Sequence, residues 1–411
     1  MQPLLLDGRE RRRLRHLDPL LRGAEARHLV GAGAVLRRCG HASTVRRRPR
    51  AGQEGGMIGG MPAPGTPLEK LGFLTIGTFS PDDPRPGHES LLQEIVLAEE
   101  LGFDSVWLRH RHLQHGVSSP VTLLAAASQR TSRIEFGTAV TPLGWENPLR
   151  YAEDLATLDV LSGGRMNPGL SVGPPGHFDD VKHSLYPDTA DAEDFTYTRV
   201  ERLLSLLRGE PASTFSGVQG IEVFSDHVQP HAVGLADRVW YGAGSDRSAV
   251  WAGEHGLNLL TSSVVRVGED EEPDFEGIQS RTIQAYRKAL PDGRSGRVSQ
   301  GLVVIPTDSA TSEQVAKYSE YVEGRTPRTS SPQGPGRLLF ARDILGTSEE
   351  IAAALYAHAA FREVTEVVFA LPFGFAHEDY VQILTDMATH LGPVLGWPGV
   401  ASGATGGRAG A

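Results

Sequence analysis

The stretch IEFGTAVTPLGWENPLRYAEDLATLDVLSGGRMNPGLSVG, residues 134–173, decides the fold of this chain. Its hydrophobic pattern predicts, in order, a strand, a helix and a second strand, at 134–140, 148–161 and 166–173. Asn147 and Pro148 are typical of a helix start, and Gly163 with Gly164 is typical of a helix end. A strand, a crossover helix and another strand form the unit from which parallel α/β folds are built.

The same alternation of strands and helices continues along most of the chain. Eight strands are predicted, at residues 71–80, 104–109, 134–140, 166–173, 239–244, 257–262, 300–305 and 366–371. Helices are predicted after them, at 88–101, 120–130, 148–161, 197–207, 245–255, 277–290, 312–322, 348–361 and 378–391. Eight strands that are each followed by a helix indicate an α/β fold of the (β/α)8 TIM-barrel type. Insertions are expected after the fourth strand, at 174–196, and at 208–237 and 323–346.

An open doubly wound sheet is the alternative fold. Such sheets carry a Gly-rich phosphate loop after their first strand, and this sequence has none at that position. The barrel is therefore favoured.

The charge of the chain divides it into unequal parts. The whole chain of 411 residues has a net charge of −10, yet residues 1–56 contain 13 arginines against five acidic residues. We interpret residues 1–65 as a basic leader that is disordered or not part of the folded protein, with a targeting segment or a nucleic-acid-binding arm as alternatives. Residues 66–395 are the predicted barrel domain, and residues 396–411 are a predicted flexible tail, rich in Gly, Ala and Ser.

Composition excludes several classes of protein. A single cysteine, Cys39, allows no internal disulfide framework and no CxxC metal or redox motif, so a cytoplasmic location is the expectation. No stretch approaches 18 consecutive apolar residues, which disfavours a membrane span. An acidic body also disfavours nucleic acid as a partner.

The loop GAGSDRS, residues 242–248, lies between a predicted strand and a predicted helix. Backbone N–H groups at a helix N-terminus, with Ser245, Ser248 and Arg247 beside them, are suited to a phosphate group. The alternative is an ordinary Gly turn with a Ser cap.

Two histidines follow the second predicted strand, His110 and His112, with Arg111 between them. This spacing allows a metal site, a polar substrate pocket or plain surface histidines. The other strand ends supply no further metal ligands, so we expect no metal. No carboxylate pair and no Ser/His/Asp constellation is recognisable at the strand ends, which suits a ligand whose own atoms carry the chemistry.

Five stretches together resemble the bacterial-luciferase-like family of flavin-dependent monooxygenases and oxidoreductases. They are AEELGFDSVWLRHRH (98–112), IEFGTAVTPLGWENPLRYAEDLATLDVLSGGR (134–165), GLSVG (169–173), YGAGSDRSAVWAGEHGLNLL (241–260) and EVVFALPF (366–373). The resemblance covers about residues 70–395. It implies a (β/α)8 barrel with a flavin-type cofactor at the C-terminal mouth.

The resemblance also implies roles for individual residues. A non-proline cis peptide is expected between Ala139 and Val140, against the flavin ring. Ser171 and Gly173, after the fourth strand, are expected beside the flavin. Its phosphate would be held by the residues Gly244, Ser245 and Ser248 and by Arg199, which from the residues alone is more simply a solvated helix position.

Two departures from the family pattern limit what the resemblance implies. Arg111 stands where true luciferases have their catalytic histidine, with His112 matching the neighbouring position, and Ser171 and Val172 replace a Cys-Arg pair. Light emission is therefore not expected. The candidate catalytic residues are His112, Arg111 and His110. They are expected to stabilise a reduced-oxygen species or to act as acid–base groups.

Three functional hypotheses follow. The first is an FMN-dependent monooxygenase that uses reduced FMN, supplied by a separate flavin reductase, and O₂ to oxygenate a small organic substrate. The second is a hydride-transfer oxidoreductase that uses the deazaflavin F420, although the acidic body argues against a basic mouth for its oligoglutamate tail. The third is a flavin-binding protein without catalysis. Family members are often dimers, so a homodimer is a further expectation.

Overall fold

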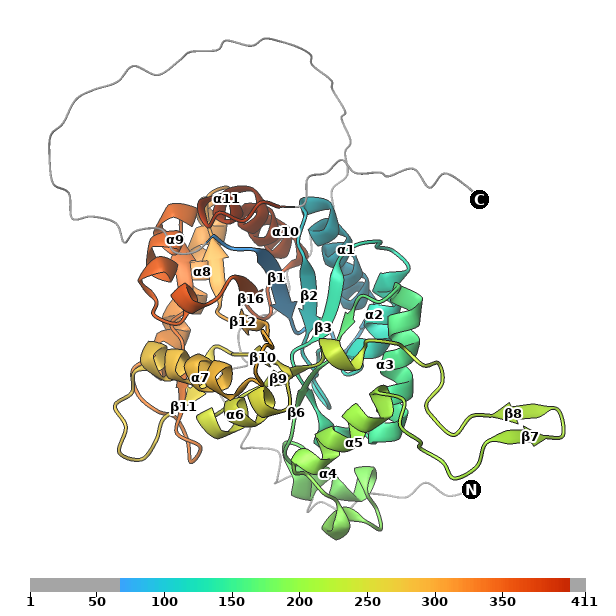
Figure 1. Ribbon diagram of the computed structural model, residues 1–411. Coiled ribbons are helices and arrows are strands. Elements are labelled where there is room, and N and C mark those ends of the chain that lie inside the picture. The colour runs from blue at the N-terminus through green and yellow to red at the C-terminus, as the bar shows by residue number, and fades with distance from the viewer. Residues whose placement is uncertain (1–66, 400–411) are drawn as a thin grey trace, which may run out of the picture. The chain divides into compact units, whose positions relative to one another are not determined.

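The barrel strands form a closed ring of parallel pairs (Figure 1). The computed structural model describes residues 67–399. Its main sheet has the order β4-β6-β9-β10-β12-β16-β1-β2-β3-β5. The two ends of this order are halves of the same two segments, because β3 is continued by β4 and β5 by β6. Since β3 pairs with β5 and β4 pairs with β6, the sheet closes on itself, and the open-sheet alternative is wrong.

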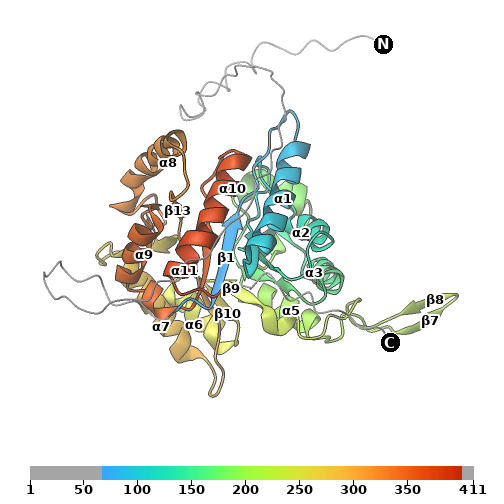
Figure 2. The same cartoon turned by 90° about the horizontal axis from the view of Figure 1, so that it is seen from above.

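Most ring strands and helices lie where the sequence predicts them, but the first strand ends at Thr75 instead of residue 80, and the seventh lies at Val298–Gln300 instead of 300–305. The ring strands are β1 (Lys70–Thr75), β2 (Ser105–Leu108), β3 (Glu135–Thr138), β4 (Thr141–Pro142), β5 (Met166–Asn167), β6 (Gly169–Ser171), β9 (Trp240–Gly242), β10 (Asn258–Leu260), β12 (Val298–Gln300) and β16 (Glu366–Ala370). The helices around them are α1 (Arg85–Leu101), α2 (Pro120–Ser128), α3 (Pro148–Ser162), α5 (Tyr197–Leu207), α6 (Asp246–Glu254), α7 (Phe275–Ala289), α8 (Ser312–Arg325), α9 (Ser348–Ala357), α10 (His377–Asp386) and the short α11 (Gly392–Val394). Viewed from above, these helices surround the strands (Figure 2).

Both ends of helix α3, within residues 134–173, are set by residues next to them in the sequence. The Asn147 side chain accepts hydrogen bonds from the backbone N–H groups of Leu149 and Arg150, and Gly163 ends the helix with a left-handed φ of 72°. Both ends are therefore fixed by local chemistry that the sequence shows directly.

The interior of the barrel is filled by an aromatic layer. Trp107 and Trp240 meet edge to face with ring centroids 5.4 Å apart, and both are fully buried. Below them, Arg297 lies over the Trp240 ring and is paired with Glu366 at 2.8 Å. This layer and ion pair close the N-terminal end, so the barrel is a packed core and only its other end is open to a ligand.

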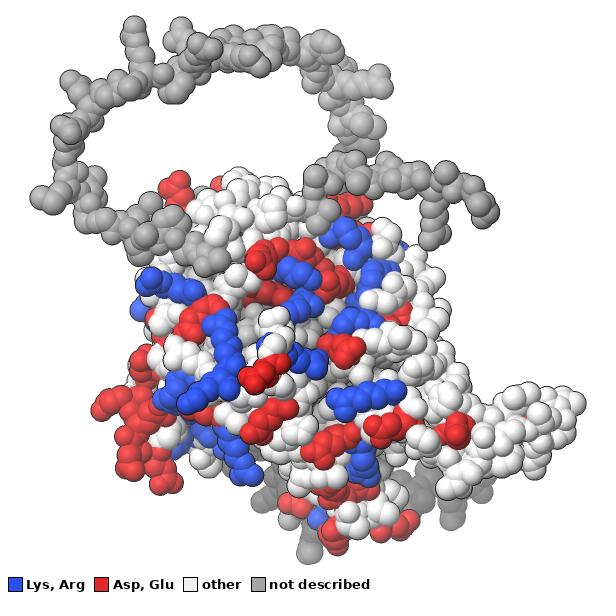
Figure 3. All heavy atoms as spheres, in the orientation of Figure 1, with Lys and Arg blue, Asp and Glu red and all other residues white. Residues whose placement is uncertain are grey.

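The three predicted insertions contain structure that the sequence did not reveal. The first holds α4 (Phe178–Leu185), the second holds the hairpin of β7 (Gly217–Gln219) and β8 (Glu222–Phe224), and the third holds β14 (Leu338–Phe340) and β15 (Ile344–Gly346). Strand β14 pairs with β11 (Val264–Arg266), and β15 pairs with β13 (Val304–Pro306). The hairpin projects from the barrel and carries the exposed side chains of Val218, Ile221 and Val223, while acidic and basic groups are interspersed over the body in Figure 3.

The folded part extends beyond its predicted end at residue 395. Trp397 is 5% exposed, and its Nε1–H donates to Asp104 at 2.9 Å. The predicted tail boundary at Gly396 is therefore wrong by at least two residues. The predicted basic leader, residues 1–65, and residues 400–411 lie outside the described part of the chain.

Candidate functional site

A cavity of about 480 Å³ lies at the C-terminal ends of the barrel strands. Its apolar lining includes Leu74, Ala139, Val140, Leu260, Val303 and Val368, and its polar lining includes Ser171, Thr261, Ser262, Ser299 and four arginines. A second pocket of about 310 Å³ shares Ala243, Gly244, Thr261, Ser262 and Val264 with it. Together they form a path from the barrel mouth past the β9–α6 loop. The larger cavity alone has the volume of a small-molecule site.

The peptide bond between Ala139 and Val140 is cis, which confirms the sequence prediction. Both residues line the cavity, at the break between β3 and β4. A Cβ added to Gly242 would lie 2.7 Å from Cγ1 of Val140, so only glycine fits on β9 at this point. The result is a smooth wall of small side chains, above the two buried tryptophans.

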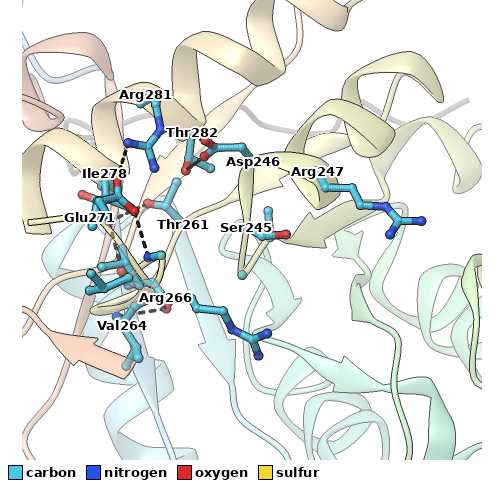
Figure 4. Close-up of a pocket in the computed structure, with 17 residues that line it drawn as sticks. Ser245, Asp246, Arg247, Thr261, Val264, Arg266, Glu271, Ile278, Arg281 and Thr282 are labelled. Atoms are coloured by element: carbon cyan, nitrogen blue, oxygen red, sulfur yellow. Dashed lines mark hydrogen bonds and ion pairs between the residues drawn. The ribbon is translucent and has the colours of Figure 1, made fainter. Parts of the chain in front are cut away.

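The β9–α6 loop presents the start of helix α6 to the second pocket (Figure 4). Ser245 caps this helix: its Oγ accepts from the backbone N–H of Ser248, and the Ser248 Oγ donates to the Ser245 carbonyl at 2.8 Å. The N–H groups of Asp246 and Arg247 remain without partners inside the helix, because they belong to its first turn. Such groups attract an anion.

Positive side chains surround this loop. In Figure 4, Arg247 extends to the right of Ser245, and Arg266 lies below Ser245 and extends toward the same side. Both are exposed, and within residues 67–399 neither side chain has a hydrogen-bond or ion-pair partner. The Asp246 carboxylate points away, toward Arg281 at 2.7 Å and Thr282 at 2.6 Å. The prediction that Gly244 and Ser245 face a ligand is therefore consistent with the geometry, whereas the hydroxyl of Ser248 is used within the cap.

The two candidate histidines belong to one hydrogen-bonded chain that leads away from the cavity. His110 lines the cavity; its Nδ1 lies 3.4 Å from Nε2 of His112, and its Nε2 lies 2.9 Å from Oγ1 of Thr141. Thr141 in turn contacts the hydroxyl of the buried Tyr151 at 2.5 Å. Burial, and to a lesser degree the neighbouring His112, lowers the pKa of His110 to about 3, so its imidazole is neutral near pH 7.

His112 does not line the cavity. Its ring stacks on Trp145 with centroids 4.2 Å apart, and burial lowers its pKa. The catalytic roles of both histidines stay predictions: His110 lines the cavity, and His112 is connected to it through its contact with His110.

Glu146 completes a group with the two histidines. One ligand atom from each of the three residues lies within 4.8 Å of the others, an arrangement that could hold a metal ion. Burial raises the pKa of Glu146 to about 7, with Asp154 adding to the shift and Arg199 opposing it. The expectation of no metal stays a prediction.

Arg199 does not reach the cavity, contrary to the sequence prediction. It is 3% exposed, and all five of its N–H donors are committed within the protein. Its partners are the carbonyls of Leu143, Glu146 and Asp194, the carboxylate of Glu193 and the hydroxyl of Tyr186, at 2.7–3.2 Å. Its role in this structure is to fasten the loop after β4 to helix α5.

The other expected flavin contacts have different outcomes. Ser171 lines the cavity, and its contact with a flavin stays a prediction. Gly173 lines neither pocket and adopts a φ of 119°, and its N–H donates to the Phe195 carbonyl, so it shapes the backbone turn after β6.

The sequence model of the luciferase-like monooxygenases matches residues 70–354. The chain belongs to the luciferase-like monooxygenase family. The resemblance that the five stretches indicated is confirmed.

Its relatives within the luciferase-like monooxygenase family differ in chemistry. The 4-hydroxyprotoasukamycin monooxygenase of Streptomyces nodosus subsp. asukaensis is 32% identical over 153 residues, which cover 36% of this chain and 40% of that protein. The F420-dependent glucose-6-phosphate dehydrogenase of Kineococcus radiotolerans is 28% identical over 356 residues, 80% of this chain and 98% of that protein. The first three curated relatives are matched over 40% to 54% of their length.

A solved structure shows the same fold. The oxygenating constituent of 3,6-diketocamphane monooxygenase of Pseudomonas putida, in complex with FMN, has a TM-score of 0.55 and 13% identity, with 80% of this chain and 98% of that one covered. Luciferase-like relatives thus include both FMN and F420 enzymes. Within residues 67–399, no helix combines the length and apolar character needed to cross a bilayer.

Sequence reasoning assigned no role to three of the four arginines that line this family member's cavity. Arg109, Arg111, Arg325 and Arg328 all line it, and only Arg111 was singled out beforehand, for a different reason. Arg325 and Arg328 come from the third insertion and its border, where no motif marks them. Their convergence depends on how the insertion folds over the mouth.

Proposed function

We propose that this protein is an FMN-dependent monooxygenase that uses reduced FMN and O₂ to oxygenate a small organic substrate. The observation that carries the proposal is the wall of small side chains at Ala139, Val140 and Gly242, in a cavity that continues to a helix N-terminus. A flat ring with a chain ending in a phosphate fits that shape, because the wall is apolar and the far end attracts anions. When bound, FMN would supply the redox chemistry with O₂.

The chain's own residues would position the cofactor and exclude water. Ala139, Val140 and Ser171 would contact the ring, and the first N–H groups of α6, with Gly244 and Ser245, would hold the phosphate. The buried Trp107 and Trp240 prevent access from below. A dry, preorganised wall is what slows unproductive reactions of a reduced flavin.

His110 and Arg111 are the candidates for polar roles at the reacting edge. His110 is neutral near pH 7 and its Nε2 is held by Thr141, so it would offer a hydrogen bond to a ligand through Nδ1, in exchange for the 3.4 Å contact of that atom with His112. Arg111 is a cation in the cavity wall that can stabilise negative charge. His112 would position the His110 ring.

The source of reduced FMN is a further part of the proposal. We expect a separate flavin reductase to supply it, since no nicotinamide fingerprint is evident in the sequence. Tight binding of NAD(P)H by the purified protein would count against this partner. Cytoplasmic location and a homodimer stay predictions.

A second candidate is F420-dependent hydride transfer. The observation in its favour is the positive charge of the mouth, with Arg247 and Arg266 along the second pocket and four arginines in the first. The net negative charge of the chain disfavours F420 at the level of composition. The arginines that line the two pockets nevertheless make the charge around the barrel opening positive. An oligoglutamate tail would suit these arginines.

Rapid mixing distinguishes the candidates. The protein is loaded anaerobically with reduced FMN or reduced F420 and mixed with O₂ while the cofactor absorbance is followed. The monooxygenase proposal expects reduced FMN to bind and to be reoxidised several-fold more slowly than free FMN. Binding of reduced F420 alone would favour the second candidate, and FMN reoxidised at its free rate would favour a non-catalytic flavin-binding protein.

A further inference from the structure

Four guanidinium groups converge on the barrel mouth from separate parts of the chain. Arg109 and Arg111 follow β2, Arg325 ends α8, and Arg328 lies in the short 3-10 helix Thr326–Thr329. The side chain of Arg109 is solvent-accessible yet enclosed by protein, because it projects into the cavity. No acidic residue is among the residues that line this cavity.

Only one of these arginines has an acidic partner among residues 67–399. Arg325 pairs with the buried Asp343, with Nη2 and Oδ1 3.0 Å apart. The side chains of Arg109, Arg111 and Arg328 form no hydrogen bond or ion pair within the same residues, and the Nε atoms of Arg111 and Arg328 are buried without a partner. Buried donors of this kind are costly unless something accepts from them.

Aromatic faces hold two of the unpaired groups in place. Arg111 lies over the Phe373 ring with 5.6 Å to its centroid, and Arg328 lies over Phe340 at 4.3 Å. A guanidinium stacked in this way is oriented before any ligand arrives, so less entropy is lost on binding. The arginines are therefore arranged as a site and are not merely solvated side chains.

Mutual repulsion is the cost of this arrangement. Burial and then the charge of Arg111 lower the pKa of Arg109 to about 10, and burial and then Arg325 lower the pKa of Arg328. Both groups remain charged at neutral pH. A bound anion would offset the repulsion and satisfy the unpaired donors.

The geometry points to a substrate that carries an oxyanion group, a carboxylate, sulfonate or phosphate, bound by Arg109, Arg111 and Arg328. This inference rests on the proposed function, since it places the substrate in the cavity beside a flavin ring that lies against Ala139 and Val140. The cofactor phosphate is the other possible source of such an anion. It is assigned instead to the start of α6, so the test must separate the two.

Isothermal titration calorimetry on the FMN-loaded and on the flavin-free protein provides the test. The probes are benzoate, benzenesulfonate and phenyl phosphate, compared with the neutral benzamide. The variants are Arg109→Gln and Arg328→Gln, with Arg150→Gln as the matched control, because Arg150 is exposed on α3 and pairs with Asp154 at 3.5 Å. Thermal melting verifies that each variant is folded, and each site variant serves as a check on the other.

We expect at least one anion to bind ten-fold or more tightly than benzamide. Losing one charged donor group should weaken its binding by roughly 10- to 100-fold in both site variants and by less than two-fold in Arg150→Gln. Equal binding of benzamide, absence of binding by all three anions, or wild-type anion affinity in both site variants overturns the inference.

A cofactor comparison separates the two sources of the anion. If the site variants lose affinity for FMN but keep that for riboflavin, which lacks the phosphate, the arginines hold the cofactor and the substrate class is wrong. Failure of the wild type to bind any flavin contradicts the proposed function instead, and the comparison of anions with benzamide on the flavin-free protein still decides the present inference.

Discussion

At the residue scale, a substitution of Gly244 should affect ligand binding without affecting the stability of the fold. A Cβ added there meets nothing within 4 Å, and no left-handed φ requires glycine at this position. Gly244→Ala should therefore unfold like the wild type, yet it should weaken FMN retention by about ten-fold, because the methyl group occupies space that the phosphate approaches. Fluorescence titration with FMN and thermal melting measure the two effects.

The control for this variant is Gly176→Ala, another glycine with open space around an added Cβ, located outside both pockets. It should change neither quantity. Unchanged FMN affinity in Gly244→Ala would show that the phosphate does not lie at this loop.

His112 is a positioning residue at the same scale. His112→Phe keeps a ring to stack on Trp145 but removes the atom that contacts His110. We expect kcat to fall by about 10²-fold, the lower range for a general acid–base group, with the FMN affinity unchanged. His115→Phe, at an exposed position nearby, is the control, and rescue of kcat by His112→Gln would support a hydrogen-bonding role.

The profile of kcat against pH tests the state of His110. With its pKa near 3, its imidazole should stay neutral from pH 5 to pH 9, so no step in that range belongs to it. If the wild type showed a step in kcat between pH 5 and pH 9 that disappeared in a still active His110→Gln variant, the assignment of a neutral His110 would be wrong.

At the element scale, the seam between α1 and α10 predicts a dependence of stability on pH. Glu94 is buried in α1 and contacts Nδ1 of His377 at 3.1 Å, and burial outweighs this contact and raises the Glu94 pKa to about 7. The folded protein therefore binds a proton more tightly than the unfolded chain. This stabilising contribution is complete below pH 4.5 and is lost as the pH rises through 7.

Glu94→Gln should remove that loss. The free energy of unfolding of the variant minus that of the wild type is measured by urea unfolding at two pH values. This difference should be more positive at pH 8.5 than at pH 5, by about 1–3 kcal/mol. Glu89→Gln, at a half-exposed position on the same helix, should leave the alkaline loss in place. A pH profile that is the same in Glu94→Gln and the wild type would contradict the argument.

Elements with local signals could be predicted from the sequence, and those without could not. Asn147, Pro148 and Gly163 determine α3 through neighbouring backbone groups, so its bounds were predicted within one residue. Arg325 and Arg328 have no such local signal, because their position in the cavity depends on how the third insertion folds. That fold is created by the pairing of β11 with β14, which lie 70 residues or more apart in the chain. Arg199 was misassigned for the same reason, since its partners lie up to 56 residues away.

At the scale of the whole molecule, the two ends of the barrel domain stabilise each other. The N–H of Leu68 donates to the Leu395 carbonyl at 3.0 Å, and Trp397 packs beside Phe103 with centroids 6.0 Å apart. Trp397→Ala should lower the free energy of unfolding by about 3 kcal/mol, as removal of a buried Trp typically does. Val394→Ala, at a 43% exposed position, should change it little, and an equal effect of both would count against closure by Trp397.

The closed barrel with its C-terminal mouth was predictable because eight strand–helix repeats admit few arrangements, and the resemblance located the cis bond between Ala139 and Val140. The charge of the mouth was not predictable from composition. A net charge averages over the whole surface, whereas the ligand meets only the arginines that the fold brings together.

The identity of the flavin that the protein retains tests the central claim most directly. The purified protein is incubated with an equimolar mixture of FMN and F420, both reduced, under anaerobic conditions, freed of unbound cofactor, and analysed by mass spectrometry. The account predicts FMN at close to one molecule per chain. Retention of neither cofactor would contradict it, and retention of F420 alone would replace the monooxygenase with hydride transfer.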